Sequence, residues 1–131
     1  MLGKRPLSVW VLCLGNGVLA VFLIASSLIA EERGYTPWQA AISGICGLGL
    51  TLSAHAAWFG NRLGRNLLLA IITLFLGLLL MQSLLTLLWA WQNGYQGPIA
   101  GAALTRFCLS LLWLVVNYGF LLSKRARVFF A

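Results

Sequence analysis

Four long apolar runs, separated by short polar segments, set the pattern of hydrophobic and polar positions along this chain. A helix needs about 20 apolar residues to cross the roughly 30 Å of hydrocarbon in a bilayer. Each run reaches that length. The pattern therefore predicts an all-α protein with membrane-spanning helices at about residues 7–30, 37–60, 66–91 and 99–123.

The segments that separate these runs are short, at residues 31–36, 61–65 and 92–98. Short links favour antiparallel neighbours in helical bundles. We therefore expect one polytopic transmembrane domain over residues 1–131, with its four helices in an up-down-up-down bundle.

Lysine and arginine collect on one side of this expected bundle. Seven of the nine lie in the first tail, the middle connection and the final segment, at Lys4, Arg5, Arg62, Arg65, Lys124, Arg125 and Arg127. Both acidic residues, Glu31 and Glu32, occur in the first connection. Because cytoplasmic loops retain an excess of Lys and Arg, we expect a multi-pass protein of the bacterial inner (plasma) membrane, with both termini in the cytoplasm.

Composition restricts the class of protein further. The chain is 61% hydrophobic and 8% charged, whereas soluble domains carry about 25% charged residues. We therefore expect the lipid bilayer to surround it. The net charge of +7 comes from short basic groups beside apolar runs, where cations contact anionic headgroups. It predicts no nucleic-acid partner.

The first span also has features of a cleaved signal peptide. Lys4 and Arg5 precede an apolar run that reaches small residues at positions 25–27. The hydrophobic part of a signal peptide is only about 7–15 residues long, and this run is longer. A retained helix is the favoured interpretation, and cleavage stays open as the alternative.

Arg106 is the one charge inside a predicted span. An arginine at the centre of a membrane helix costs about 2.5–3.5 kcal/mol. At roughly 100° per residue, its helix face also carries Ser110, Trp113 and Asn117. We expect this stripe to face protein. One interpretation is that Arg106 binds an anion or an acidic partner. The favoured interpretation is structural: the side chain either reaches the outer headgroups or pairs with Glu31 or Glu32 and so fixes the fold.

Small residues line one face of the second predicted helix, at Ala40, Gly44, Gly47 and Thr51. Small residues at intervals of about four let two helix backbones approach closely in a membrane. We therefore expect this face to meet another helix.

Three further polar residues, together with Asn117, are candidates for interaction within the membrane. His55 is the only histidine, and Asn16 and Asn117 are expected at a similar depth, so that the three can form a polar cluster. Gln82 lies further out, at a depth comparable with that of Arg106. Hydrogen bonding between helices is the favoured role of His55.

The final segment, residues 124–131, is basic and then apolar. Such a segment can lie on a membrane with its cations at the headgroups. We expect Phe129 and Phe130 to enter the acyl chains of the inner leaflet.

Function is restricted mainly by what the spans do not contain. No Asp or Glu lies within them, whereas proton-coupled transporters and cation pumps generally use ionisable groups inside the membrane. We expect no enzymatic activity, no cofactor and no bound metal. The favoured role is contact with another membrane protein or with a second copy, as an accessory subunit of a membrane assembly or an immunity-type protective factor. The alternative is an oligomeric small transporter, channel or lipid flippase.

Overall fold

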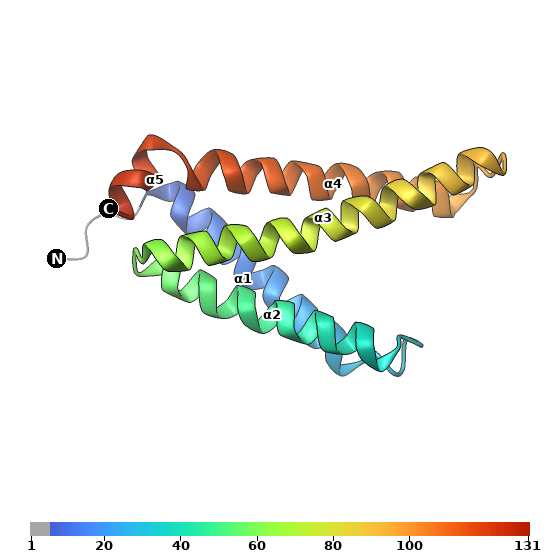
Figure 1. Ribbon diagram of the computed structural model, residues 1–131, viewed down its shortest axis with the longest axis horizontal. Helices are drawn as coiled ribbons and strands as arrows, with labels where there is room; N and C mark the ends of the chain where they lie inside the picture. The colour runs from blue at the N-terminus through green and yellow to red at the C-terminus, as the bar shows by residue number, and fades with distance from the viewer. Residues whose placement is uncertain (1–5) are drawn as a thin grey trace.

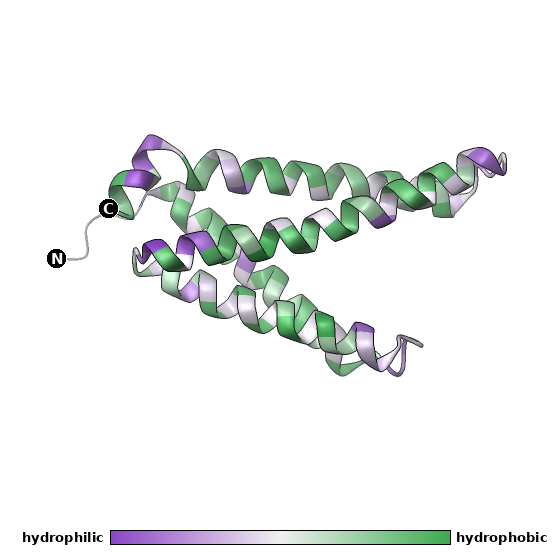
Figure 2. Ribbon diagram, in the orientation of Figure 1, coloured by the Kyte–Doolittle hydropathy of each residue, from purple (hydrophilic) through white to green (hydrophobic). Residues whose placement is uncertain are grey.

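The computed structural model describes residues 6–131, and Lys4 and Arg5 lie outside this range. All regular secondary structure in the described residues is helical. The elements are α1 (Leu7–Leu28), α2 (Pro37–Trp58), α3 (Arg62–Gln92), α4 (Pro98–Leu121) and α5 (Lys124–Phe129). The first four are long enough and apolar enough to cross a membrane. This confirms the four predicted spans. Figure 2 shows hydrophobic residues along most of each long helix and hydrophilic residues gathered toward the helix ends.

The largest difference in helix bounds is at the start of α3. The sequence pattern placed residues 61–65 in a connection, whereas α3 begins at Arg62. The Asn61 side chain accepts hydrogen bonds from the amides of Leu63 and Gly64 at 2.8 and 3.4 Å. An asparagine in this position satisfies amides that the first helical turn leaves free. The expected connection was therefore too long, and Arg62 belongs to the first turn of α3.

The four long helices form two hairpins, α1 with α2 and α3 with α4. In Figure 1 the hairpins lie side by side where α5 and the α2–α3 turn are found, and they diverge toward the other end. We call the first region the closed end; it consists of the start of α1, the turn at residues 59–61 and α5. The open end carries the connections at residues 29–36 and 93–97.

Most of the large buried side chains lie in the closed half. The largest fully buried ones in that half are Val9, Leu12, Asn16, Leu50, Leu68, Ile72, Asn117, Leu121 and Phe130. Three of these belong to α1. Residues of α1 therefore form part of this core.

The α1/α2 hairpin is held by the small-residue face of α2. A Cβ atom added to Gly47 would lie 3.0 Å from the Ala20 carbonyl oxygen, and one added to Gly44 would lie 3.0 Å from Ser27 Oγ. Ser27 Oγ also donates a hydrogen bond of 2.8 Å to the Ala40 carbonyl. The expectation that this face meets another helix is confirmed, and that helix is α1.

Thr51 was expected on the same packed face, and the structure places it at the edge of that face, where it lines a groove together with Cys13 of α1. Its side chain is exposed, and its hydroxyl donates to the Gly47 carbonyl of its own helix at 2.9 Å. This internal bond satisfies the hydroxyl without a second helix.

The α3/α4 hairpin has a seam with a period of seven residues. The buried positions include Leu69, Leu76, Ser83 and Ala90 on α3 and Ala103, Ser110 and Asn117 on α4. Buried residues at this interval are typical of helices that wind around each other with a left-handed twist. Toward the open end the seam residues are serine and alanine, whose small side chains allow two helix backbones to approach closely.

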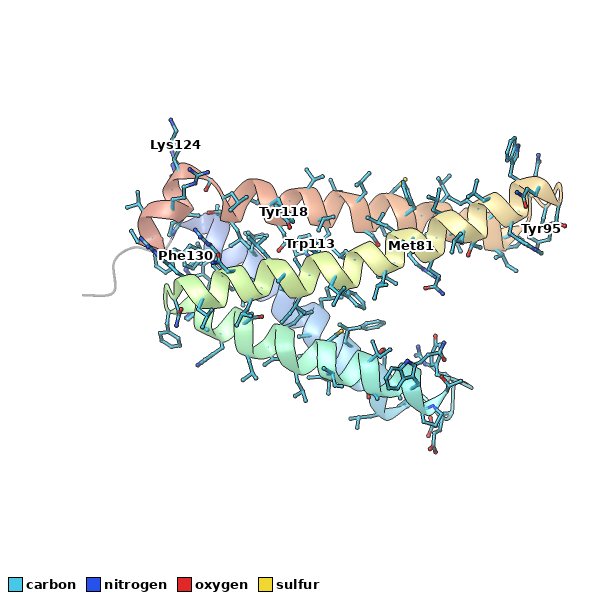
Figure 3. The ribbon with its side chains drawn as sticks, in the orientation of Figure 1. Met81, Tyr95, Trp113, Tyr118, Lys124 and Phe130 are labelled. Atoms are coloured by element: carbon cyan, nitrogen blue, oxygen red, sulfur yellow. The ribbon has the colours of Figure 1, made fainter. Side chains whose placement is uncertain are left out.

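The end of the chain turns back over the closed end. Phe130 is 1% exposed, and its carbonyl accepts a 2.7 Å hydrogen bond from Arg62 Nε. The guanidinium carbon of Arg65 lies 5.4 Å from the centre of the Phe130 ring, and Figure 3 shows this ring at the closed end. The expectation that Phe130 enters the acyl chains was wrong, because the ring is buried inside the protein.

Candidate functional site

A polar cluster joins α1 to α4 in the closed half. Asn16 Nδ2 donates to Asn117 Oδ1 at 2.7 Å, Trp113 Nε1 donates to Asn16 Oδ1 at 3.0 Å, and Asn117 Nδ2 donates to the Trp113 carbonyl at 2.8 Å. Both asparagines are fully buried. Every polar side-chain atom of the two amides has a partner within the chain. The expected match in depth between Asn16 and Asn117 is confirmed, and the cluster serves to hold α1 against α4.

Gly15 makes room for this cluster. A Cβ atom added at Gly15 would lie 2.6 Å from an atom of the Trp113 ring. The indole can therefore lie across α1 and reach Asn16 only because position 15 has no side chain. Sequence analysis missed this role, although a glycine next to a membrane asparagine was an available signal.

A second polar contact joins α3 to α4. The hydroxyl oxygens of Thr73 and Tyr118 are 2.7 Å apart. Thr73 already donates to the Leu69 carbonyl at 2.6 Å, so Tyr118 is the donor in the pair. Sequence analysis did not find this contact, because the two residues lie 45 positions apart and neither belongs to a motif.

His55 does not join the asparagine cluster, and Trp113 takes the third place expected for it. The imidazole is exposed and packs edge-on against Phe59, with 5.0 Å between the ring centres. It lines an open groove of about 360 Å³ whose walls include Cys13 and Thr51. The structure therefore places His55 on the outer surface of the α1/α2 hairpin.

Arg106 is exposed although the other members of the predicted stripe, which lie nearer the closed end, are packed. Ser110 is 6% exposed and Asn117 is fully buried, and Trp113 is half-buried. Arg106 lies within about 20° of both Trp113 and Asn117 around the helix. At the level of Asn117 this face contacts α1, whereas the hairpins diverge toward the open end (Figure 1). The predicted packing of the stripe against protein is confirmed for its other members and wrong for Arg106.

The expected ion pair between Arg106 and the first connection is absent. Within residues 6–131, the structure gives the Arg106 guanidinium no hydrogen bond and no salt bridge, and neither Glu31 nor Glu32 contacts it. Arg106 follows Pro98, the first residue of α4, by eight positions. At 1.5 Å per residue this is about 12 Å along the helix, so the charge lies inside the apolar segment.

Gln82 on α3 resembles Arg106 on α4 in its helix face and in its exposure. Around the helix it lies about 20° from Ile71, whose side chain faces Gly49 of α2. Gln82 itself is exposed, and its amide has no hydrogen bond to any other described residue. We call Gln82 and Arg106 the wedge residues, because both lie on faces directed toward the α1/α2 hairpin, beyond the point where the hairpins separate.

Sequence analysis also missed Ser83, which follows Gln82 in α3. Ser83 is 1% exposed, and its hydroxyl has no hydrogen-bond partner among the described residues. It lies in the seam with α4, where a small side chain lets the helices approach. Its spacing of seven residues from both Leu76 and Ala90 was the sequence signal that could have identified Ser83 as a seam residue.

Comparison with protein-family models, with curated proteins and with solved structures finds no match to this chain. The candidate site is therefore characterised by its own side chains: a polar cluster whose groups bind one another, and the wedge residues.

Proposed function

We propose that this protein acts through contacts with other proteins inside the membrane, as an accessory subunit of a membrane assembly or as an immunity-type protective factor. The supporting observation is the contrast between its polar groups. Asn16, Trp113 and Asn117 bind one another, whereas the side chains of the wedge residues Gln82 and Arg106 form no hydrogen bond or salt bridge with any described residue.

A partner would lower the free energy of the wedge residues. An unpaired arginine in a membrane helix costs up to about 2.5–3.5 kcal/mol, reduced when the side chain extends to the headgroups. Hydrogen bonds between helices contribute about 0.6 kcal/mol each on average in membranes. A second protein that offers acceptors to Arg106 and Gln82 would reduce the cost of the unpaired arginine and add hydrogen bonds between helices. Both effects would stabilise the complex, so these residues favour association.

We further propose an up-down-up-down protein of the bacterial inner membrane with both termini in the cytoplasm. At the closed end, Arg62 and Arg65 start α3, and α5 carries Lys124, Arg125 and Arg127. The open end has Arg33 beside Glu31 and Glu32. Since Lys and Arg are retained on the cytoplasmic side, the closed end is cytoplasmic in this proposal. Reporter fusions after residue 131 and within residues 93–97 test it, and an external C-terminus would contradict it.

The proposed role is not catalytic and involves no nucleic acid. The only acidic residues, Glu31 and Glu32, lie outside the four long helices. General acid–base chemistry within the membrane would require a suitable titratable group near a substrate. The amides of the closed half bind one another, which supports a structural role for them.

Photocrosslinking from the wedge tests the proposed function. A photoreactive residue replaces Gln82 in one variant of the full chain and Leu84 in the control. Leu84 is also exposed but lies about 160° away around α3. We expect crosslinks to another membrane protein from position 82 and only lipid adducts from position 84. Lipid adducts alone from both positions would contradict a function based on protein contacts.

A further inference from the structure

We infer that the partner at the wedge residues is a membrane-spanning helix of a different protein, and that this helix carries a carboxylate at the depth of Arg106. This inference rests on the proposed function and specifies the chemistry of the partner. It follows from the shape of the exposed face, the charge on it and the distribution of acidic residues in this chain.

The exposed face of α4 around Arg106 has the spacing of a helix-packing surface. Ile99, Ala102, Arg106 and Leu109 follow one another at intervals of three, four and three residues. All four are exposed. This interval aligns side chains along one stripe, and Ala102 lets a neighbouring backbone approach closely one turn from the charge. A helix is therefore the element that fits this face.

The charge of Arg106 selects the side chain that such a helix presents. A guanidinium has planar N–H donors that match the two oxygens of a carboxylate. In a medium that excludes water, an opposite charge attracts more strongly than a neutral acceptor does. The exposed amide of Gln82, on the same side of the α3/α4 hairpin, can donate to a further oxygen.

A second copy of this chain cannot supply that carboxylate. Its only acidic residues are Glu31 and Glu32, and both lie in the α1–α2 connection, outside the spanning helices. A copy that presented its own α4 at the same depth would bring two Arg106 side chains together, and like charges repel. The partner must be a different protein.

Model helices in vesicles of phosphatidylcholine, which has no net charge, test this inference. The probe is a synthetic Leu/Ala transmembrane peptide with one Glu about eight residues from its end. Its control has Gln at that position. Resonance energy transfer measures association of each peptide with the labelled full-length protein. We expect the Glu peptide to bind about tenfold more tightly, within the range of polar contacts between model membrane helices.

Substitutions then test whether Arg106 causes the preference for the Glu peptide over the Gln peptide. Arg106→Gln should remove it, whereas Arg33→Gln, the same charge change in the connection at the open end, should leave it intact. Arg106→Glu should reverse it, so that a peptide with Arg at the same position binds and the Glu peptide does not. The charge reversal keeps the inference testable if Arg106→Gln lowers stability.

Three results would overturn the inference. Equal binding of the Glu and Gln peptides would show that the partner helix needs no carboxylate. Displacement of the Glu peptide by phosphatidylglycerol would assign Arg106 to an anionic headgroup. Self-association that depends on Arg106 would identify a second copy as the partner. If position 82 still crosslinks to another protein, only the inference fails. If it yields lipid adducts alone, the proposed function fails as well.

Discussion

The closed and open ends of this molecule use the same four helices, yet their polar side chains have different surroundings. In the closed half, Asn16, Trp113 and Asn117 form a buried cluster, and Phe130 covers the core. Toward the open end, Arg106 continues the same stripe of α4 but has no partner among residues 6–131. The comparison shows that one helix face can be packed over part of its length and exposed over the rest.

The open end is not loosely packed within each hairpin. Gly44 and Gly47 hold α2 against α1 there, and Ser83 and Ala90 lie in the seam between α3 and α4. The opening lies between two hairpins that are each tightly packed. A partner helix would therefore meet two preformed surfaces, which reduces the ordering that association requires.

The largest expected effect lies at the closed end, at Phe130. Phe130→Ala should lower the free energy of unfolding by about 3–5 kcal/mol, because a fully buried ring is lost. Val128→Ala, in the same segment but 78% exposed, should have little effect. Unfolding in mixed micelles, followed by circular dichroism, measures both. Equal losses would show that the end of the chain does not cover the core.

A smaller effect is expected at Gly47, in the α1/α2 hairpin. Gly47→Ala should destabilise by about 1–3 kcal/mol through overpacking, since the new Cβ would lie 2.7 Å from Ile24 Cγ1. Gly77→Ala is the matched control, because a Cβ at this α3 glycine meets nothing within 4 Å. The same unfolding assay applies. A Gly47→Ala protein as stable as the control would contradict a close approach of α1 and α2.

The polar cluster should give a measurable coupling between α1 and α4. A double-mutant cycle of Asn16→Ala and Asn117→Ala should show a coupling of about 0.6–1.7 kcal/mol, the range for side-chain contacts within membranes. Asn16→Ala combined with Gln82→Ala should be additive. Absence of coupling in the first cycle would mean that the 2.7 Å contact does not stabilise the isolated protein.

The smallest effect on stability is expected at Arg106. Arg106→Gln should change the free energy of unfolding of the isolated chain by less than about 0.5 kcal/mol, as is usual for an exposed residue without partners. The sequence alone had favoured a role in fixing the fold, which predicts a larger loss. A loss above about 2 kcal/mol, well outside the usual range for surface substitutions, would restore that role and weaken the comparison between the two ends.

The sequence by itself determined the features that depend on local periodicity and length. The four spans follow from runs of apolar residues, and the packed face of α2 follows from Gly44 and Gly47. The shared depth of Asn16 and Asn117 follows from counting residues from the helix ends. Each of these needs only the rise and turn of a helix, which are the same in any fold.

Only the tertiary structure decided which faces meet and where they separate. The position of Trp113 depends on the missing side chain at Gly15. Likewise, α3 can start close to α2 because Gly64 has no side chain: a Cβ there would lie 2.7 Å from the backbone of Ala56. These contacts join residues of different helices and set how the helices cross. The divergence of the hairpins leaves Arg106 exposed, and the turn of the final segment over the closed end buries Phe130, because burial depends on the neighbouring elements as much as on the residue itself.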